Sequence, residues 1–175
     1  MRYVALFRGI NVGGNTMIKM ETLRATFSAL GFENVKSYIN SGNLVFDTAK
    51  TDDGKLAKKI HDAVKIDFAK EISIMVRSIA EIEEVIANNP YEGQFENDKE
   101  MHVFFLGTEL SPEKEQMLRD LNSDAELISV NGRTIYCLLR ISIVDSVLGK
   151  GFIDKKLRIP ATARNWRTVK KLAGL

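Results

Sequence analysis

The segment with the clearest chemical potential follows the first apolar stretch and reads Arg8-Gly9-Ile10-Asn11-Val12-Gly13-Gly14-Asn15. In a loop between a strand and a helix, backbone N–H groups can hold an anion, and glycines let the backbone approach it closely. Arg8 can bind two oxygen atoms of such a group at once. The segment is neither a dinucleotide-binding fingerprint nor a P-loop, because no Gly-Lys-Ser/Thr follows. It predicts either a site for a phosphate or carboxylate group or a structural turn in which Arg8 forms an ion pair.

A second group of polar residues lies near the C-terminus, just before a basic helix. Our hypothesis for a ligand site joins this group to the first loop, as the set Arg8, Asn11, Gly13, Gly14, Arg164 and Asn165. The alternative interpretation is structural. In it, Asn11 holds a turn, Asn165 caps a helix, and Arg164 pairs with an acid of residues 79–144.

The turn Ser41-Gly42-Asn43 is either structural or a further part of a site, since glycine and asparagine accept positive φ at low cost. It follows the second expected strand, whereas Asn11 follows the first. If these two strands run antiparallel, the turn and the loop lie at opposite ends of the sheet. This geometry argues against one site that contains both Asn11 and Asn43.

Other residue types that often carry chemistry are sparse. The two histidines, His61 and His102, are far apart, and there is no cysteine cluster, so we expect no metal site. Cys137 alternates with apolar neighbours and is expected to be a buried small side chain rather than a nucleophile. Ser41 lacks the Gly-x-Ser-x-Gly elbow of a serine hydrolase. No motif indicates a cofactor, and no residue set identifies a reaction.

The composition is that of an ordinary globular protein of 175 residues, with 45% apolar and 27% charged residues. A single cysteine excludes an intramolecular disulfide, and we expect a cytoplasmic protein. No apolar run approaches the roughly 18 residues of a membrane helix. The charge is uneven: residues 1–78 carry +4, residues 79–144 carry −8 and residues 145–175 carry +6. The basic segments either neutralise the acidic one or bind a polyanion, so nucleic acid is a weaker alternative partner.

The order of elements predicts an α+β fold of two ferredoxin-like (α-β plait) subdomains, residues 1–80 and 81–175. Strands are expected at 3–8, 35–39, 44–46 and 72–77, with helices at 20–30 and 56–68 between them. This is the order β-α-β-β-α-β. The second half follows a capping box at Ser78 and Glu81, and it contains the hairpin signal Asn131-Gly132. A short helix is expected to begin at Ser142, and a last helix carries Trp166.

The two faces of the first strand can be separated by their alternation. We expect Val4 and Leu6 to face the two helices, which leaves Tyr3 and Phe7 on the other face. An aromatic face exposed to water is unusual, so either the second half covers it or a ligand stacks on it.

Three stretches together resemble a known bacterial family. They are residues 4–14, the segment Tyr38-Ile39-Asn40-Ser41-Gly42-Asn43-Leu44-Val45-Phe46, and Ala161-Thr162-Ala163-Arg164-Asn165-Trp166-Arg167-Thr168-Val169. These motifs resemble those of the domain-of-unknown-function family sixteen-ninety-seven across almost the whole chain. The departures are Ala163, where the family usually has Thr, and Asn40, where it often has Gln. The resemblance implies two ferredoxin-like subdomains and no established activity.

The sequence therefore favours a module that binds a small anionic or phosphate-bearing ligand at residues 8–15. The alternatives are an enzyme acting on such a ligand, a nucleic-acid-binding protein, and a structural or protein-interaction role. The identity of the ligand and the oligomeric state do not follow from the sequence.

Overall fold

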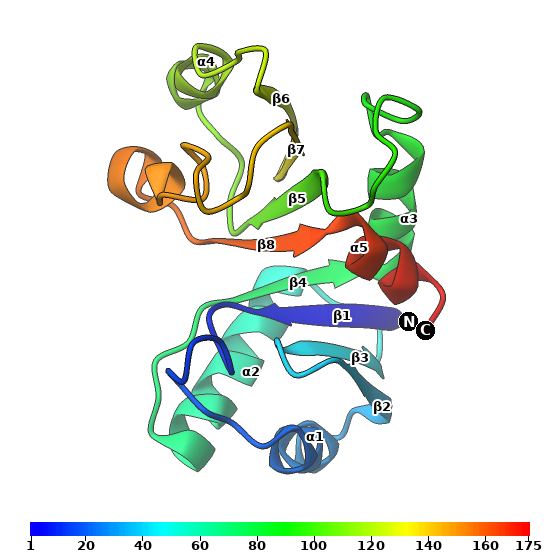
Figure 1. The fold of residues 1–175 in the computed structure, drawn as a ribbon. Helices are drawn as coiled ribbons and strands as arrows, with labels where there is room; N and C mark the ends of the chain where they lie inside the picture. Colours follow the sequence, from blue (N-terminus) through cyan, green and yellow to red (C-terminus); the bar gives the residue numbers. More distant parts are fainter. The chain divides into compact units, whose positions relative to one another are not determined.

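The computed structural model describes residues 1–175, and the chain divides into two compact units (Figure 1). The first unit comprises Met1–Glu83 with Leu172–Leu175, and the second comprises Glu84–Lys171. The first six elements are β1 (Arg2–Phe7), α1 (Met20–Ala29), β2 (Glu33–Tyr38), β3 (Asn43–Asp47), α2 (Asp53–Phe68) and β4 (Ile74–Ser78). After α3 (Ile79–Ala87) come β5 (Met101–Leu106), α4 (Pro112–Arg119), β6 (Glu126–Asn131), β7 (Thr134–Leu139), η1 (Ile153–Leu157), β8 (Ala161–Asn165) and α5 (Trp166–Ala173).

Each unit contains one four-stranded sheet with antiparallel neighbours. The strand orders are β2-β3-β1-β4 and β6-β7-β5-β8. The same order of pairing therefore occurs twice, and the expected α+β fold with two ferredoxin-like halves is confirmed. In the second half the π-helix η1 replaces the second α-helix of the motif.

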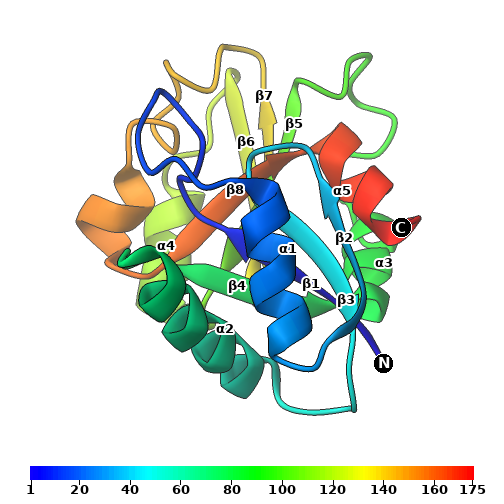
Figure 2. The same ribbon diagram turned by 90° about the horizontal axis from the view of Figure 1, so that it is seen from below.

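The expected assignment of the first strand's two faces is wrong. Tyr3 and Phe7, not Val4 and Leu6, belong to the core beneath α1 and α2, which cover one face of this sheet (Figure 2). Phe46 stacks on Tyr3 with ring centroids 6.0 Å apart. Because β1 is apolar on both faces, its alternation does not reveal which face meets the helices. The aromatic platform expected on the opposite face is therefore absent.

The expected separation of the two loops is also wrong. Strands β1 and β2 both pair antiparallel with β3, so they are parallel to each other. The loop after β1 and the turn after β2 consequently lie at the same end of the sheet. The Phe7 N–H donates to the Gly42 carbonyl at 2.8 Å, and Nδ2 of Asn11 donates to the Asn40 carbonyl at 2.7 Å.

In the second unit, the helix expected to begin at Ser142 is absent. The chain forms turns and bends after Ser142, and the first helical residue is Phe152, directly before η1. The Ser146 hydroxyl donates to the Ile143 carbonyl at 2.9 Å and accepts from the Gly149 N–H at 2.8 Å. A side chain that binds the nearby backbone in this way competes with helical hydrogen bonds.

Helix α3 is fixed at both ends by side chains. At its start, Glu81 accepts from the Ser78 N–H at 2.7 Å, and the Glu81 N–H donates to the Ser78 hydroxyl, which confirms the predicted capping box. Near its end, the hydroxyl of buried Tyr136 donates to the Val85 carbonyl at 2.8 Å. That carbonyl belongs to the last turn, where helical partners are missing.

Tyr136→Phe is therefore expected to lower the free energy of unfolding by about 1 to 2 kcal/mol, because a buried carbonyl loses its donor. Urea denaturation monitored by circular dichroism measures this loss. Tyr91→Phe serves as the control, since Tyr91 is half-buried and its hydroxyl makes no hydrogen bond. Equal stability of the two variants would contradict the role given to Tyr136.

Candidate functional site

The two sheets have the same register, which allows their residues to be compared one by one. In the first unit, Tyr3 pairs with Phe46 on one side and with Ser78 on the other. At the equivalent place in the second unit, His102 pairs with Cys137 and Asn165. Ser78 and Asn165 also correspond in a second way. Each is the last residue of its strand and caps the helix that follows, α3 after Ser78 and α5 after Asn165.

The equivalent positions are filled very differently. In the first unit, two stacked aromatic rings occupy the space, the Tyr3 hydroxyl donates to the Thr51 carbonyl at 3.0 Å, and the 16-residue helix α2 packs on the sheet. In the second unit, an imidazole and a thiol replace the two rings, and the 5-residue η1 replaces α2. A hollow of about 730 Å³ lies at this place, beside His102 and Asn165.

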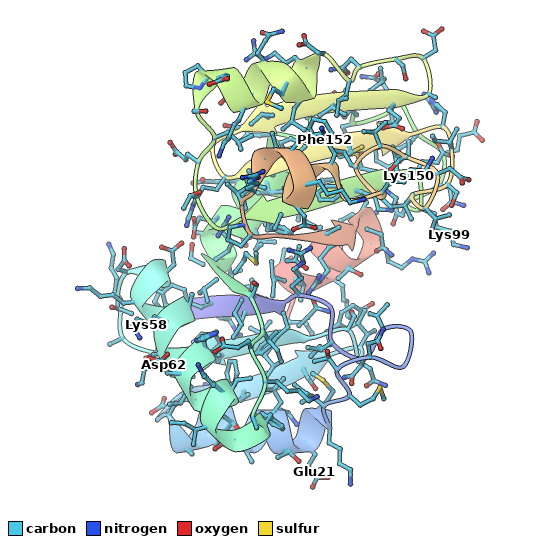
Figure 3. The ribbon with its side chains drawn as sticks, turned by 90° about the vertical axis from the view of Figure 1, so that its left-hand side faces the viewer. Glu21, Lys58, Asp62, Lys99, Lys150 and Phe152 are labelled. Carbon is cyan, nitrogen blue, oxygen red and sulfur yellow. The ribbon has the colours of Figure 1, made fainter.

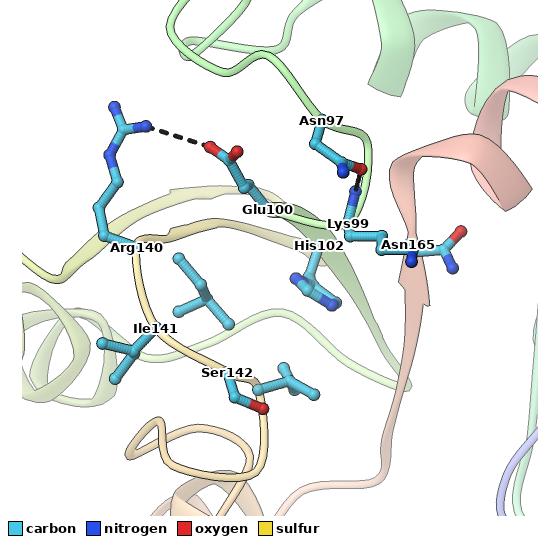
Figure 4. Close-up of a pocket in the computed structure, with 10 residues that line it drawn as sticks. Asn97, Lys99, Glu100, His102, Arg140, Ile141, Ser142 and Asn165 are labelled. Atoms are coloured by element: carbon cyan, nitrogen blue, oxygen red, sulfur yellow. Dashed lines mark hydrogen bonds and ion pairs between the residues drawn. The ribbon is translucent and has the colours of Figure 1, made fainter.

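The hollow is lined from three directions, as Figure 4 shows. The sheet contributes His102, Leu139 and Asn165, and the segment before β5 contributes Asn97, Lys99 and Glu100. The segment after β7 provides the opposite wall. Its lining residues are Arg140, Ile141, Ser142 and Ile143.

His102 is the residue of the hollow with an unmet hydrogen-bonding capacity. Its Nδ1 is buried and has no hydrogen-bond partner. Burial lowers the pKa of His102 from 6.5, and a hydrogen bond between the ring and the Glu100 backbone, which raises the pKa, opposes this effect only in part. The ring is therefore neutral at pH 7 and carries one N–H donor and one acceptor.

The lowered pKa also links His102 to stability. The folded protein resists protonation of this ring, whereas the unfolded chain takes up the proton near pH 6.5. The stability associated with neutral His102 is thus complete above about pH 6.5 and is lost as the pH falls below that value.

The charges around the hollow leave one cation without a counter-charge. Glu100 pairs with Arg140 at 3.1 Å, and Asp98 pairs with Lys170 at 3.0 Å. Arg140 is further held by the Gln94 carbonyl at 2.8 Å. Lys99 is exposed and forms no ion pair, so its ammonium group gives this rim of the hollow its net positive charge.

Only one of the two predicted C-terminal site residues lines the hollow. Asn165 does so, and its Oδ1 accepts from the Thr168 N–H at 2.9 Å. Arg164 points to the other face of the sheet, because successive strand residues alternate. There its guanidinium donates to Thr162 and to the Ala163 carbonyl, and burial lowers the pKa of Arg164 to about 10.

In the first unit, the predicted anion loop uses several of its polar groups to hold its own shape. The N–H groups of Arg8, Asn11 and Asn15 all donate to backbone carbonyls. Gly13 and Gly14 have positive φ angles of 61° and 75° and open space around them, as turn residues do.

Asn11 and Asn43 hold turns through their side chains. Asn11 accepts from the Ile18 N–H at 2.7 Å and donates to two carbonyls, and Nδ2 of Asn43 donates to the Tyr38 carbonyl at 3.0 Å. Asn11 and Asn43 thus hold turns, and Asn165 caps α5. A role of these residues in ligand binding stays a prediction. Binding of an anion at Arg8, Gly13 and Gly14 stays a prediction, as does any site that joins residues of the two units.

Sequence reasoning missed His102, Lys99 and Arg140. His102 lies near the start of β5, and its neighbours in the sheet lie far away in sequence. One signal was available in the charge pattern. Lys99 and Arg140 are two of only five cations in residues 79–144, which carry thirteen carboxylates.

The comparisons with known proteins place the chain in a family. The model of the protein family of unknown function DUF1697 matches residues 1–136. The chain belongs to the DUF1697 family. A solved structure, that of the conserved bacterial protein SP0830 from Streptococcus pneumoniae, is similar to this DUF1697 protein with a TM-score of 0.77 and 26% sequence identity. The similarity covers 99% of this chain and 97% of that one. No curated protein matches the sequence.

Two features that often indicate function, a membrane-spanning helix and a reactive cysteine, can be checked in this DUF1697 protein. No helix of the protein is both long and apolar enough to cross a membrane. Cys137 is buried, and burial raises the pKa of its thiol to about 12. The thiol is therefore protonated at neutral pH, as expected for a packing residue and not for a nucleophile.

Proposed function

We propose that the protein binds a small anionic ligand, and that the ligand occupies the hollow of the second unit. The observation that carries this proposal is the buried, unpartnered Nδ1 of His102 at the hollow. A buried polar atom without a partner costs about 1 to 3 kcal/mol, and a ligand atom that hydrogen-bonds to Nδ1 itself recovers part of this cost. Lys99 supports an anion over a neutral ligand, because its charge is not neutralised.

The sequence also predicted an anionic ligand, but it placed this ligand at the loop of residues 8–15 and not in the hollow beside His102. That loop remains the second place where such an anion can bind. A cytoplasmic location and binding of nucleic acid through the basic segments also remain predictions. Nucleic-acid binding would be marked by an affinity that falls steeply with salt concentration.

The two histidines of the chain make a direct test of the proposal. Inorganic phosphate and sulfate are added to the protein at constant ionic strength, and the ring resonances of His61 and His102 are followed by NMR. We expect saturable shifts of His102 and a rise in its pKa, because a nearby anion stabilises the imidazolium. Binding should therefore strengthen as the pH falls through the pKa of His102. His61 lies in the other unit beside Glu71, at 2.8 Å, and serves as the internal control.

A variant tests the contribution of Lys99. Lys99→Gln is expected to weaken binding about fivefold, the effect of one exposed charge. Lys156→Gln removes the same charge from an exposed position of η1 and should leave binding unchanged. If the amide signals of Gly9–Asn15 shift and His102 does not, the ligand binds at the loop and the proposal for the hollow is wrong.

The same imidazole favours a second candidate function, an enzyme acting on the bound anion. A neutral histidine can accept a proton from a substrate or from water within hydrogen-bonding distance. Conversion of an added phosphate ester during the titration, abolished in His102→Gln, would identify such an enzyme.

A further inference from the structure

The wall of the hollow across from His102 carries the apolar side chains of Ile141 and Ile143 beside Arg140 and Ser142, and its segment continues to exposed positions. Leu139, Ile141 and Ile143 line the hollow, and Ile141 is 39% exposed. The same segment continues to Val144 and Val147, which are 69% and 40% exposed. We call Ile141, Ile143, Val144 and Val147 the apolar shelf. Three of the eight large hydrophobic residues that the chain exposes thus fall within seven consecutive residues.

The apolar shelf is held in place by specific hydrogen bonds. The Val147 N–H donates to Oε1 of the buried Glu126 at 2.9 Å. The Ser146 hydroxyl joins the Ile143 carbonyl to the Gly149 N–H. These hydrogen bonds hold the backbone of the segment at Val147 and between Ile143 and Gly149. A ligand that covers the apolar surface of these side chains would gain about 25 cal/mol of free energy per Å² removed from water.

A polar end and an apolar end therefore meet in one site. His102, Lys99 and Asn165 lie on one side of the hollow, and Ile141 lies across from them (Figure 4). Pockets that bind small molecules combine a few polar groups that fix orientation with apolar walls that supply affinity. A small inorganic anion would use the polar groups and leave the apolar shelf uncovered.

We infer that the ligand is an amphipathic organic anion, a carboxylate or phosphate monoester that carries a short aliphatic group. The charged group contacts His102 and Lys99, and the aliphatic group lies on Ile141 and Ile143. This inference rests on the proposed function, because it assigns the ligand class of the same site.

A series of linear alkanoates from acetate to octanoate tests the inference on the full-length protein. Dissociation constants are measured from the His102 ring shifts at constant pH and ionic strength. We expect affinity to rise about fourfold for each added methylene, up to the length at which the apolar shelf is covered. Ile141→Ser should reduce this gain per methylene.

The matched control is Ile66→Ser, which makes the same substitution at an isoleucine that is 81% exposed on α2. It should leave the whole series unchanged. Equal affinity for acetate and octanoate, with phosphate still bound, would overturn the amphipathic ligand and leave the proposed function intact. A rising series that Ile141→Ser does not alter would overturn the contact with the apolar shelf. If neither phosphate nor any alkanoate shifts His102, both proposals are wrong.

Discussion

Asn11→Ala is expected to lower the free energy of unfolding of the first unit by about 3 kcal/mol. The Asn11 side chain accepts from the Ile18 N–H at 2.7 Å and donates to the Ile18 and Asn40 carbonyls at 2.9 and 2.7 Å. Alanine loses these three hydrogen bonds and the weak one from Nδ2 to the Met20 sulfur. It must also adopt a φ of 54°, which asparagine tolerates better than other residues with a Cβ atom. The loop would lose the hydrogen bond of Asn11 to the turn at residues 39–42.

Urea denaturation followed by hydrogen exchange at single amides measures this effect unit by unit, because two compact units need not unfold together. Asn15→Ala is the control from the same loop, since the exposed side chain of Asn15 makes no hydrogen bond. A loss of protection in β1, β2 and β3 with Asn11→Ala, and none with Asn15→Ala, is the expected pattern. The same midpoint for both variants would show that Asn11 does not hold the loop.

Gly149→Ala is expected to destabilise the second unit by about 3 to 5 kcal/mol, in the upper range for a single substitution. A Cβ atom on Gly149 would lie 1.6 Å from the Ile143 carbonyl oxygen, so the backbone itself must move. The hydrogen bonds of Ser146 to these two residues would then break. Because Ile143 lines the hollow, binding of any ligand there should weaken as well.

Lys150→Ala is the control for this variant, because it changes the next residue at an exposed position near Phe152 (Figure 3). Thermal unfolding gives the stability, and hydrogen exchange at the amides of Val147 and Gly149 reports on the turn itself. Wild-type exchange in Gly149→Ala would mean that the turn has room for a Cβ atom. That outcome would remove the argument that the apolar shelf is rigid.

Local signals in the sequence predicted local structure well. The capping box at Ser78 and Glu81 and the hairpin at Asn131-Gly132 were predicted, because each depends on residues that are neighbours in the chain. The faces of β1 could not be predicted in the same way. That strand is apolar on both sides, so only the packed structure decides that Tyr3 and Phe7 lie beneath the helices.

The candidate site was harder to predict because it depends on contacts between distant segments. His102 meets Asn165 only through the pairing of β5 with β8, and Arg140 reaches Glu100 across 40 residues of chain. The repeated register is also hidden in the sequence, since Tyr3 and His102 share a position and little chemistry. Asn165 and Arg164 are neighbours in one motif, yet alternation along β8 separates the two side chains.

The repeated register has a consequence for how this protein can change over generations. One half keeps the shared position plugged by the rings of Tyr3 and Phe46, and the other half leaves it open at His102. Substitutions of the side chains that line the open position can therefore change which ligand fits there, while the rings that fill the first position stay in place.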